Sequence, residues 1–64
     1  MQVNGNVIFL EEPQSLLDFL ETQKYDVRLI AVQCNGEIIP RTTFKDVVLK
    51  DEDTLEIVSF VGGG

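Results

Sequence analysis

Residues 2–25 read QVNGNVIFLEEPQSLLDFLETQKY, and this stretch combines the signal for a tight hairpin with the pattern of an amphipathic helix. Asn4-Gly5 follows Val3 and comes one residue before the apolar run of residues 7–10. The Asn-Gly pair favours a two-residue hairpin turn because both residues tolerate positive φ. We therefore predict one strand at about residues 1–4 and a second strand at about residues 6–10.

The second part of the same stretch, residues 11–25, has the spacing of a helix with one apolar face. Leucines recur on one side and charged residues on the other: Leu16, Leu17 and Leu20 against Asp18, Glu21 and Lys24. Pro13 suits the first helical turn, where its missing N–H is not needed. Glu11 and Glu12 would be favourable near the positive end of the helix dipole. We predict one amphipathic helix here.

The run RLIAVQCNGEIIPR, residues 28–41, begins with apolar residues in alternation: Ile30, Val32 and Cys34. A period of two residues is typical of a half-buried strand. A thiolate at Cys34 could accept or pass sulfur. However, Cys34 shares its side of the strand with two apolar residues, and free cysteines are often buried as small hydrophobes. We predict that Cys34 belongs to the core.

The remainder of the chain predicts a second turn and three more strands. Asn35-Gly36 reverses the chain, and residues 37–39 can return as a short strand. Pro40 has no N–H to donate, so it ends this strand or places it at a sheet edge. Beyond it we predict an irregular turn over residues 42–46, a short strand at 47–49, an acidic turn at 51–53 and a last strand in TLEIVSFV, residues 54–61.

This order of elements predicts the fold. A lone helix can cover only one face of a small sheet, so its apolar face and one side of each strand must form the core. We predict an α+β fold of the β-grasp type, in which a mixed four- to five-stranded sheet packs on one helix. The first and last strands would be parallel neighbours at the sheet centre. Residues 1–61 would form this domain and residues 62–64 a flexible glycine tail.

Composition excludes several classes of function. The chain has 64 residues, enough for one small core, and a net charge of −6, which repels nucleic acids and anionic membranes. One cysteine and no histidine cannot build a disulfide framework or a zinc site. The start of the chain has neither a targeting pattern nor a membrane span, so we expect a cytoplasmic protein.

The last strand predicts an exposed apolar surface. Leu55 and Ile57 share one side of the strand, and Glu56, Val58 and Phe60 share the other. Glu56 marks its side as the outer one, so Val58 and Phe60, continued by Val61, would form a docking surface for a partner. The alternative is that Phe60 folds over the end of the domain as ordinary packing.

The chain ends in three glycines, Gly62, Gly63 and Gly64, which contribute nothing to a core. They can extend about 10 Å at roughly 3.3–3.6 Å per residue. Such a segment is as thin as a polypeptide can be, so it can enter a narrow channel and present its terminal carboxylate without steric cover. The alternative is a frayed end without a role.

The whole chain resembles the ThiS family, the sulfur carriers of thiamin biosynthesis. The resemblance rests on the short length, the early Asn-Gly hairpin, the segment NGEIIPR (35–41) and the acidic turn followed by LEIVSFVGGG (55–64). It implies a ubiquitin-like β-grasp protein that is a substrate of other enzymes rather than an enzyme itself. Gly64 would be the modified residue, and Gly62 and Gly63 would present it.

The resemblance also implies a sequence of reactions. An E1-like activating enzyme, ThiF, uses ATP and magnesium to adenylate the carboxylate of Gly64. A persulfide from a cysteine desulfurase then attacks, and the end becomes a thiocarboxylate. Thiazole synthase, ThiG, takes the sulfur for the thiazole ring of thiamin. The carrier itself would bind no cofactor and no metal.

Two other features have simple interpretations. Arg41 could steady a carboxylate or phosphate, but an exposed, solvated arginine is the commoner situation. The acidic segment Asp51-Glu52-Asp53 has too few ligands for a calcium site, so we interpret it as a solvated turn.

Three alternative functions remain open at this point. The chain could be a molybdopterin synthase small subunit, which shares the fold and the thiocarboxylate chemistry but has another acceptor. It could be a ubiquitin-like modifier that forms an isopeptide bond, or a β-grasp interaction module with an inert tail. Catalysis by the chain itself is disfavoured because it has no histidine and no nucleophile with an evident base nearby.

Overall fold

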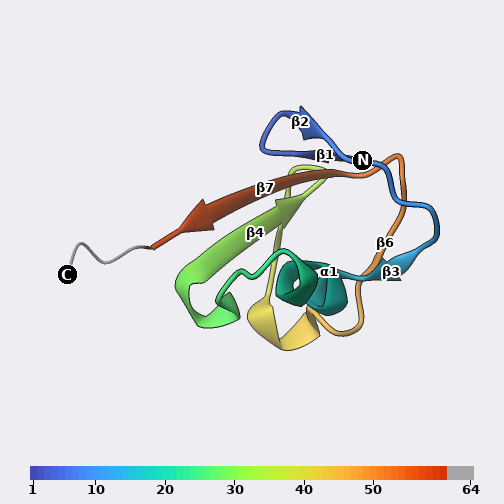
Figure 1. The fold of residues 1–64 in the computed structure, drawn as a ribbon. Coiled ribbons are helices and arrows are strands. Elements are labelled where there is room, and N and C mark those ends of the chain that lie inside the picture. Colours follow the sequence, from blue (N-terminus) through green and yellow to red (C-terminus); the bar gives the residue numbers. More distant parts are fainter. Residues whose placement is uncertain (61–64) are drawn as a thin grey trace.

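The structure is a computed structural model that describes residues 1–60, in which a mixed sheet packs on one helix (Figure 1). The main sheet has five strands in the order β2-β1-β7-β4-β5, and β3 and β6 form a separate pair. The strands are β1 (Gln2–Val3), β2 (Asn6–Val7), β3 (Gln14–Ser15), β4 (Ile30–Cys34), β5 (Glu37–Ile39), β6 (Val48–Leu49) and β7 (Thr54–Ser59). The helices are α1 (Leu16–Thr22) and the short 3-10 helices η1 (Val27–Leu29) and η2 (Arg41–Thr43). The predicted domain boundary at residue 61 and the predicted tail lie outside the described residues.

The strand order confirms the predicted fold. β7 lies at the sheet centre, where it pairs with β1 in parallel, with Val3 opposite Leu55. On its other side β7 pairs with β4 in antiparallel fashion, with Val32 opposite Ile57. The first and last strands of the sheet are therefore parallel neighbours although about fifty residues separate them, which is the β-grasp arrangement.

Both Asn-Gly turns form as predicted, but the second strand is shorter than predicted. Asn4 and Gly5 have φ of 51° and 86°, and Asn35 has φ of 53°, values that non-glycine residues other than asparagine rarely adopt. β2 ends at Val7 rather than near residue 10. The Ile8 N–H still donates to the Met1 carbonyl (2.7 Å), and beyond it the Leu10 N–H donates to Asp51 Oδ1 (3.0 Å), so the chain has left the sheet by residue 10.

The helix begins later than predicted. Pro13 does not lie in its first turn, because residues 14 and 15 form β3 and pair with β6, with Ser15 opposite Val48. Ser15 then caps α1 by accepting a hydrogen bond from the Asp18 N–H on its Oγ (3.0 Å). A capping serine satisfies an otherwise unpaired N–H, so it defines the helix start more strongly than a nearby proline. No helix among residues 1–60 is long and apolar enough to cross a membrane.

The core lies between α1 and one face of the sheet. The helix contributes Leu16, Phe19 and Leu20, all fully or almost fully buried, whereas Leu17 is only partly buried. Phe44, in the segment predicted to be an irregular turn, is also buried, at 2% exposure. The sheet and β6 complete the core with Val3, Ile30, Val32, Leu49, Leu55 and Ile57, together with Met1. One face of the sheet is thus covered, and the other is available.

Candidate functional site

The outer face of β7 is the part of the molecule that leads into the C-terminal residues. Leu55 is 0% exposed and Ile57 is buried, whereas Val58 is 58% exposed and Phe60 is 55% exposed. The alternation confirms the predicted division of the strand into an inner and an outer side. The Phe60 N–H donates to the Leu29 carbonyl (2.6 Å), so the chain remains attached to the sheet at the last described residue. The structure thereby presents two apolar side chains directly before residue 61.

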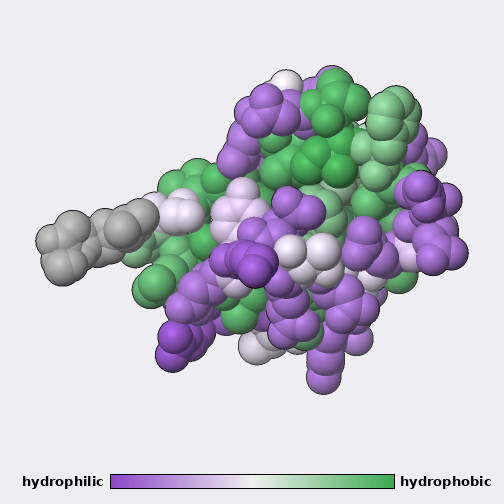
Figure 2. All heavy atoms as spheres, viewed as in Figure 1, coloured by the Kyte–Doolittle hydropathy of each residue, from purple (hydrophilic) through white to green (hydrophobic). Residues whose placement is uncertain are grey.

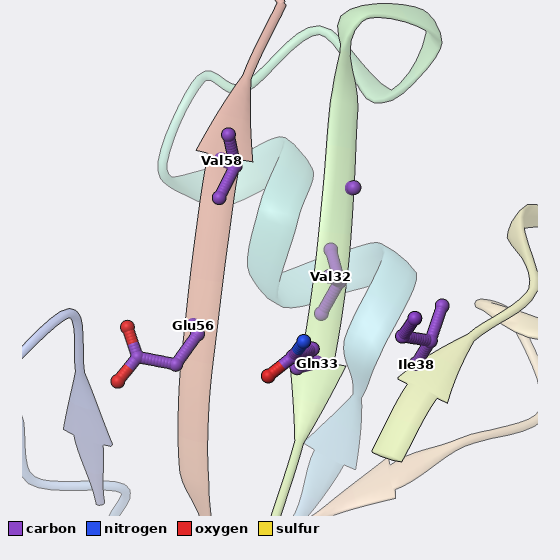
Figure 3. Close-up of a pocket in the computed structure, with 6 residues that line it drawn as sticks. Val32, Gln33, Ile38, Glu56 and Val58 are labelled. Atoms are coloured by element: carbon purple, nitrogen blue, oxygen red, sulfur yellow. The ribbon is translucent and has the colours of Figure 1, made fainter. Parts of the chain in front are cut away.

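Neighbouring strands extend this surface. Cross-strand pairing places Val58 beside Ala31 and places Gln33 between Glu56 and Ile38. These five residues line a hollow of about 320 Å³, with the buried Val32 beneath them. Figure 3 shows Glu56 and Val58 on β7, Gln33 on the neighbouring β4 and Ile38 on β5. We call Ala31, Gln33, Ile38, Glu56 and Val58, together with Phe60, the outer face.

Ile38 is the exposed, strongly apolar member of the outer face that was not predicted from the sequence. Its side chain is 73% exposed, although it is one of two adjacent isoleucines in a short strand. The signal was present in the sequence. A two-residue Asn35-Gly36 turn fixes the register so that Gln33 pairs with Ile38, which places Ile38 on the same side as Gln33 and not on the core side.

Apart from Leu29 and Val48, the exposed large apolar side chains of residues 1–60 form two groups. Figure 2 shows apolar surface over the β1–β2 hairpin and beside the end of β7, each among hydrophilic side chains. At the hairpin end the exposed residues are Val7 and Phe9, which point to solvent where the chain leaves the sheet. Only the second patch adjoins the C-terminal residues, so it is the better candidate for a site that presents them.

The surroundings of Cys34 disfavour its thiolate form. Its side chain is partly buried and packs against the core, in agreement with the predicted role. Burial raises the pKa of the Cys34 thiol, and the nearby carboxylates of Asp53 and Glu37 raise that pKa further. Since the thiolate is the nucleophilic form, a higher pKa makes Cys34 less suited to sulfur transfer.

The acidic turn is more than the solvated turn that the sequence predicted. Asp51 Oδ1 accepts hydrogen bonds from the Met1 ammonium (2.9 Å) and the Leu10 N–H (3.0 Å), so it joins distant segments. Asp53 Oδ1 accepts from Asn35 Nδ2 (2.9 Å). The Leu10 N–H and the Met1 ammonium both lower the pKa of the Asp51 carboxyl. These carboxylates serve to fix the fold, and within residues 1–60 no three side chains of the usual metal-binding types form a group that could hold an ion.

Arg41 is exposed, as predicted, and its guanidinium donates to the backbone carbonyl of Arg28 (3.2 Å). The other predicted site residues, Val61, Gly62, Gly63 and Gly64, lie outside the described residues. Their roles as docking residue, presenting residues and modified residue remain predictions.

Comparisons with known proteins agree on one family. A family model described as the ThiS family matches residues 1–64. The sulfur carrier protein ThiS of Bacillus subtilis is 35% identical over 65 residues, which covers 100% of this chain and 98% of that protein. A crystal structure of the thiamine biosynthesis protein ThiS from Geobacter metallireducens superimposes with a TM-score of 0.83 at 30% identity, over 98% of this chain and 96% of that one.

A longer relative contains the same kind of sequence. The thiazole synthase of Magnetococcus marinus is 31% identical over 64 residues, which covers 100% of this chain and 20% of that protein. The family model and the Bacillus relative both span this chain from end to end, and the fold matches that of the Geobacter protein. The chain therefore belongs to the ThiS family of ubiquitin-like β-grasp proteins.

Proposed function

We propose that this chain is the sulfur carrier that supplies sulfur for the thiazole ring of thiamin, and that it carries the sulfur as a thiocarboxylate on Gly64. The observation that supports this most is its full-length similarity to the sulfur carrier ThiS of Bacillus subtilis. The similarity includes the end of the chain, where the exposed outer face leads directly into Val61 and three glycines.

The chemistry requires only an accessible carboxylate on the carrier. A carboxylate oxygen of Gly64 attacks the α-phosphorus of ATP and releases pyrophosphate. The resulting mixed anhydride is a good acyl donor because AMP is a far better leaving group than oxide. A persulfide sulfur attacks the acyl carbon and displaces AMP, and a thiol then cleaves the S–S bond to release the thiocarboxylate.

The folded body would provide the binding energy for these steps. Val58, Ile38 and Phe60 are each more than half exposed, and together they offer an apolar contact to a partner. Glu56 lies among them, and the chain carries a net charge of −6, so a partner surface with basic groups around an apolar centre would be complementary. Glycines at the end would supply access to a narrow active site, because they have no side chains to exclude.

The proposed partners follow from the chemistry. An E1-like activating enzyme of the ThiF type would adenylate Gly64 with ATP and magnesium, and a cysteine desulfurase would supply the persulfide. The acceptor would be thiazole synthase, ThiG. Support for the acceptor comes from the thiazole synthase of Magnetococcus marinus, a fifth of whose length resembles this entire chain. Because the steps use ATP and reduced thiols, we place them in the cytoplasm.

Intact-protein mass spectrometry tests the proposal. The chain is incubated with an activating enzyme of the ThiF type, ATP, magnesium, a cysteine desulfurase and cysteine, beside a matched chain that lacks Gly64. The proposal predicts a gain equal to one sulfur replacing one oxygen in the full chain and no gain in the shortened chain. Adding thiazole synthase with its other substrates should return the mass to its starting value. An unchanged mass, with enzymes that are active on another ThiS-family carrier, would contradict the proposal.

A further inference from the structure

The two edges of β7 are paired to different extents. On one side, β4 pairs with β7 from Leu55 to Ser59, and the Phe60 N–H continues this ladder. On the other side, β1 pairs only with Thr54 and Leu55. The half of β7 that is nearest to residue 61 therefore has a strand on one side only.

Asn4 continues the pairing where β1 stops. Its backbone N–H donates to the Leu55 carbonyl (2.9 Å), after which the chain turns away at Gly5. The Asn4 side chain then bonds both backbone groups of Ile57. The Ile57 N–H donates to Asn4 Oδ1 (2.7 Å), and Asn4 Nδ2 donates to the Ile57 carbonyl (3.2 Å). The Asn4 carboxamide thus makes the two hydrogen bonds to Ile57 that a backbone peptide unit would make if β1 continued alongside β7.

Ser59 is the next residue whose backbone groups face this side. Residues along a strand direct their N–H and C=O groups alternately to the two neighbours. Phe60 bonds to the β4 side and Ile57 bonds to Asn4, so Ser59 faces the same side as Ile57. Within residues 1–60 no strand pairs with Ser59 on that side, and Ser59 is exposed. Its N–H and C=O therefore form an open edge of the central strand.

We propose that this open edge at Ser59 binds an extended backbone segment of the activating enzyme, which adds a strand alongside β7. The partner's identity rests on the proposed function. We infer a peptide backbone because the Asn4 carboxamide already pairs with Ile57 on the same edge of β7. A carboxamide has the same donor and acceptor as a peptide unit. Strand addition supplies affinity through main-chain hydrogen bonds. It would also hold β7 in a fixed direction directly before residues 61–64.

The position favours an enzyme segment over a second copy of this chain. The open edge lies between Val58 and Phe60, whose side chains are exposed on the outer face, so one partner could cover both. Two copies that met at this edge would each bring a net charge of −6, and like charges disfavour their association. An enzyme with basic groups would instead be attracted.

Backbone chemistry tests the proposal, because a chain of this length can be made by peptide synthesis. One variant carries N-methylserine at position 59, which deletes the N–H and keeps the side chain. The matched control is Ser59→Ala, which deletes the hydroxyl and keeps the N–H. The probe is an activating enzyme of the ThiF type, and its Kd is measured by fluorescence anisotropy. Losing one main-chain hydrogen bond should raise the Kd about tenfold for the N-methyl variant, whereas Ser59→Ala should change it less than about twofold.

Amide hydrogen exchange provides a second test that needs no variant. The Ser59 N–H should exchange fast in the free chain and at least about tenfold more slowly in the complex, as expected for a new hydrogen bond. The Val58 N–H, which faces β4, should be protected in both states. This test applies even if N-methylation prevents the chain from folding, which circular dichroism would reveal.

The outcomes separate this inference from the proposed function. An unchanged Kd for the N-methyl variant, or a Ser59 N–H that exchanges equally fast in the complex, overturns strand addition. The mass gain at Gly64 would still support the sulfur-carrier function in either case. A dimer of the chain that disappears on N-methylation would also overturn the inference, since a second copy would then occupy the edge. No mass gain in the parent chain would contradict the proposed function whatever the state of this edge.

Discussion

The two faces of β7 differ although they belong to one strand of six residues. On the inner side Leu55 and Ile57 are buried against α1 and its neighbours. On the outer side Val58 is as apolar as its inner neighbours but is more than half exposed. No other described element of the chain covers it, because the only α-helix among residues 1–60 packs on the opposite face. The inner face explains stability, and the outer face is available for recognition.

The difference shows how one central strand can support the core on one side and offer an exposed apolar surface on the other. The core takes up the buried apolar residues of α1 and of the strands on either side of β7. Few apolar residues remain to form a second layer over the outer face. The sheet therefore remains open on the side that leads to the C-terminal residues. Substitutions on the two faces should therefore affect different properties, stability on the inner side and binding on the outer side.

The largest effect is expected from Leu55→Ala on the inner face. Leu55 is completely buried, and truncation of such a leucine costs about 2–5 kcal/mol of unfolding free energy. Because domains of this size have only about 3–5 kcal/mol in total, much of the variant should be unfolded. Urea unfolding followed by circular dichroism measures this. Glu56→Ala, on the outer side of the same strand, is the matched control and should change the unfolding free energy by less than about 0.5 kcal/mol. Equal losses for both variants would contradict the division into two faces.

The next largest loss of stability is expected from Asn4→Gly, at the edge of β7 that faces β1. Glycine keeps the positive φ of the turn, so the variant removes only the two side-chain hydrogen bonds to Ile57. These bonds are partly buried, and their loss should cost about 1–3 kcal/mol. Asn35→Gly is the matched comparison, since Asn35 also has positive φ but makes exposed side-chain bonds.

Thermal unfolding of the two glycine variants decides this prediction. Asn4→Gly should have the lower melting temperature, because water replaces the exposed bonds of Asn35 more easily than the partly buried bonds of Asn4. If Asn35→Gly were equally or more destabilised, the Asn4 carboxamide would not be the main link between the first turn and β7.

A smaller effect, on binding rather than stability, is expected from Val58→Thr on the outer face. Threonine keeps the shape and the β-branch of valine, so the sheet should be preserved. An apolar anchor replaced by a hydroxyl should raise the Kd for the activating enzyme about five- to tenfold. Isothermal titration calorimetry measures this, with Glu21→Gln on the exposed side of α1 as control. A Val58→Thr chain that binds like the parent would remove Val58 from the docking surface.

The smallest effect is expected on the pH dependence of stability. It concerns Asp51, which lies on neither face of β7. Hydrogen bonds from Leu10 and the Met1 ammonium lower the pKa of Asp51 below 3.8 in the folded chain. The resulting stability is therefore present above pH 3.8 and is lost as the pH falls through the folded pKa. Asp51→Asn should lose this acid dependence and be slightly less stable at neutral pH. Unfolding midpoints measured between pH 2 and pH 7 test it, and parallel curves for the two chains would contradict the assignment.

The sequence was informative where the signal was local. Both Asn-Gly turns, the alternation along β7 and the exposure of Val58 and Phe60 depend on neighbouring residues, and all were predicted correctly. The exposure of Ile38 was not predicted, although it is also a local feature. The Asn35-Gly36 turn determines the pairing of Ile38 with Gln33 of β4. The outer face could therefore have been predicted almost completely from the sequence.

The errors occurred where distant segments decide the structure. Pro13 favoured an earlier helix start, but pairing of β3 with β6, more than thirty residues later, takes residues 14 and 15 out of the helix. Phe44 is isolated among polar residues, so no periodic pattern marks it as core. The bonds between Asn4 and Ile57 depend on the register of β1 against β7, which no local pattern encodes.

The most direct test of the central claim is the position of the transferred sulfur. Intact mass spectrometry of the parent chain after reaction with the complete activating system, followed by fragmentation, locates the added sulfur to a residue. The account predicts ATP-dependent replacement of one oxygen by sulfur at Gly64. The thiocarboxylate should form more slowly on the Val58→Thr chain when the activating enzyme is limiting. Sulfur found instead on Cys34, or no sulfur at all with an active control carrier, would contradict it.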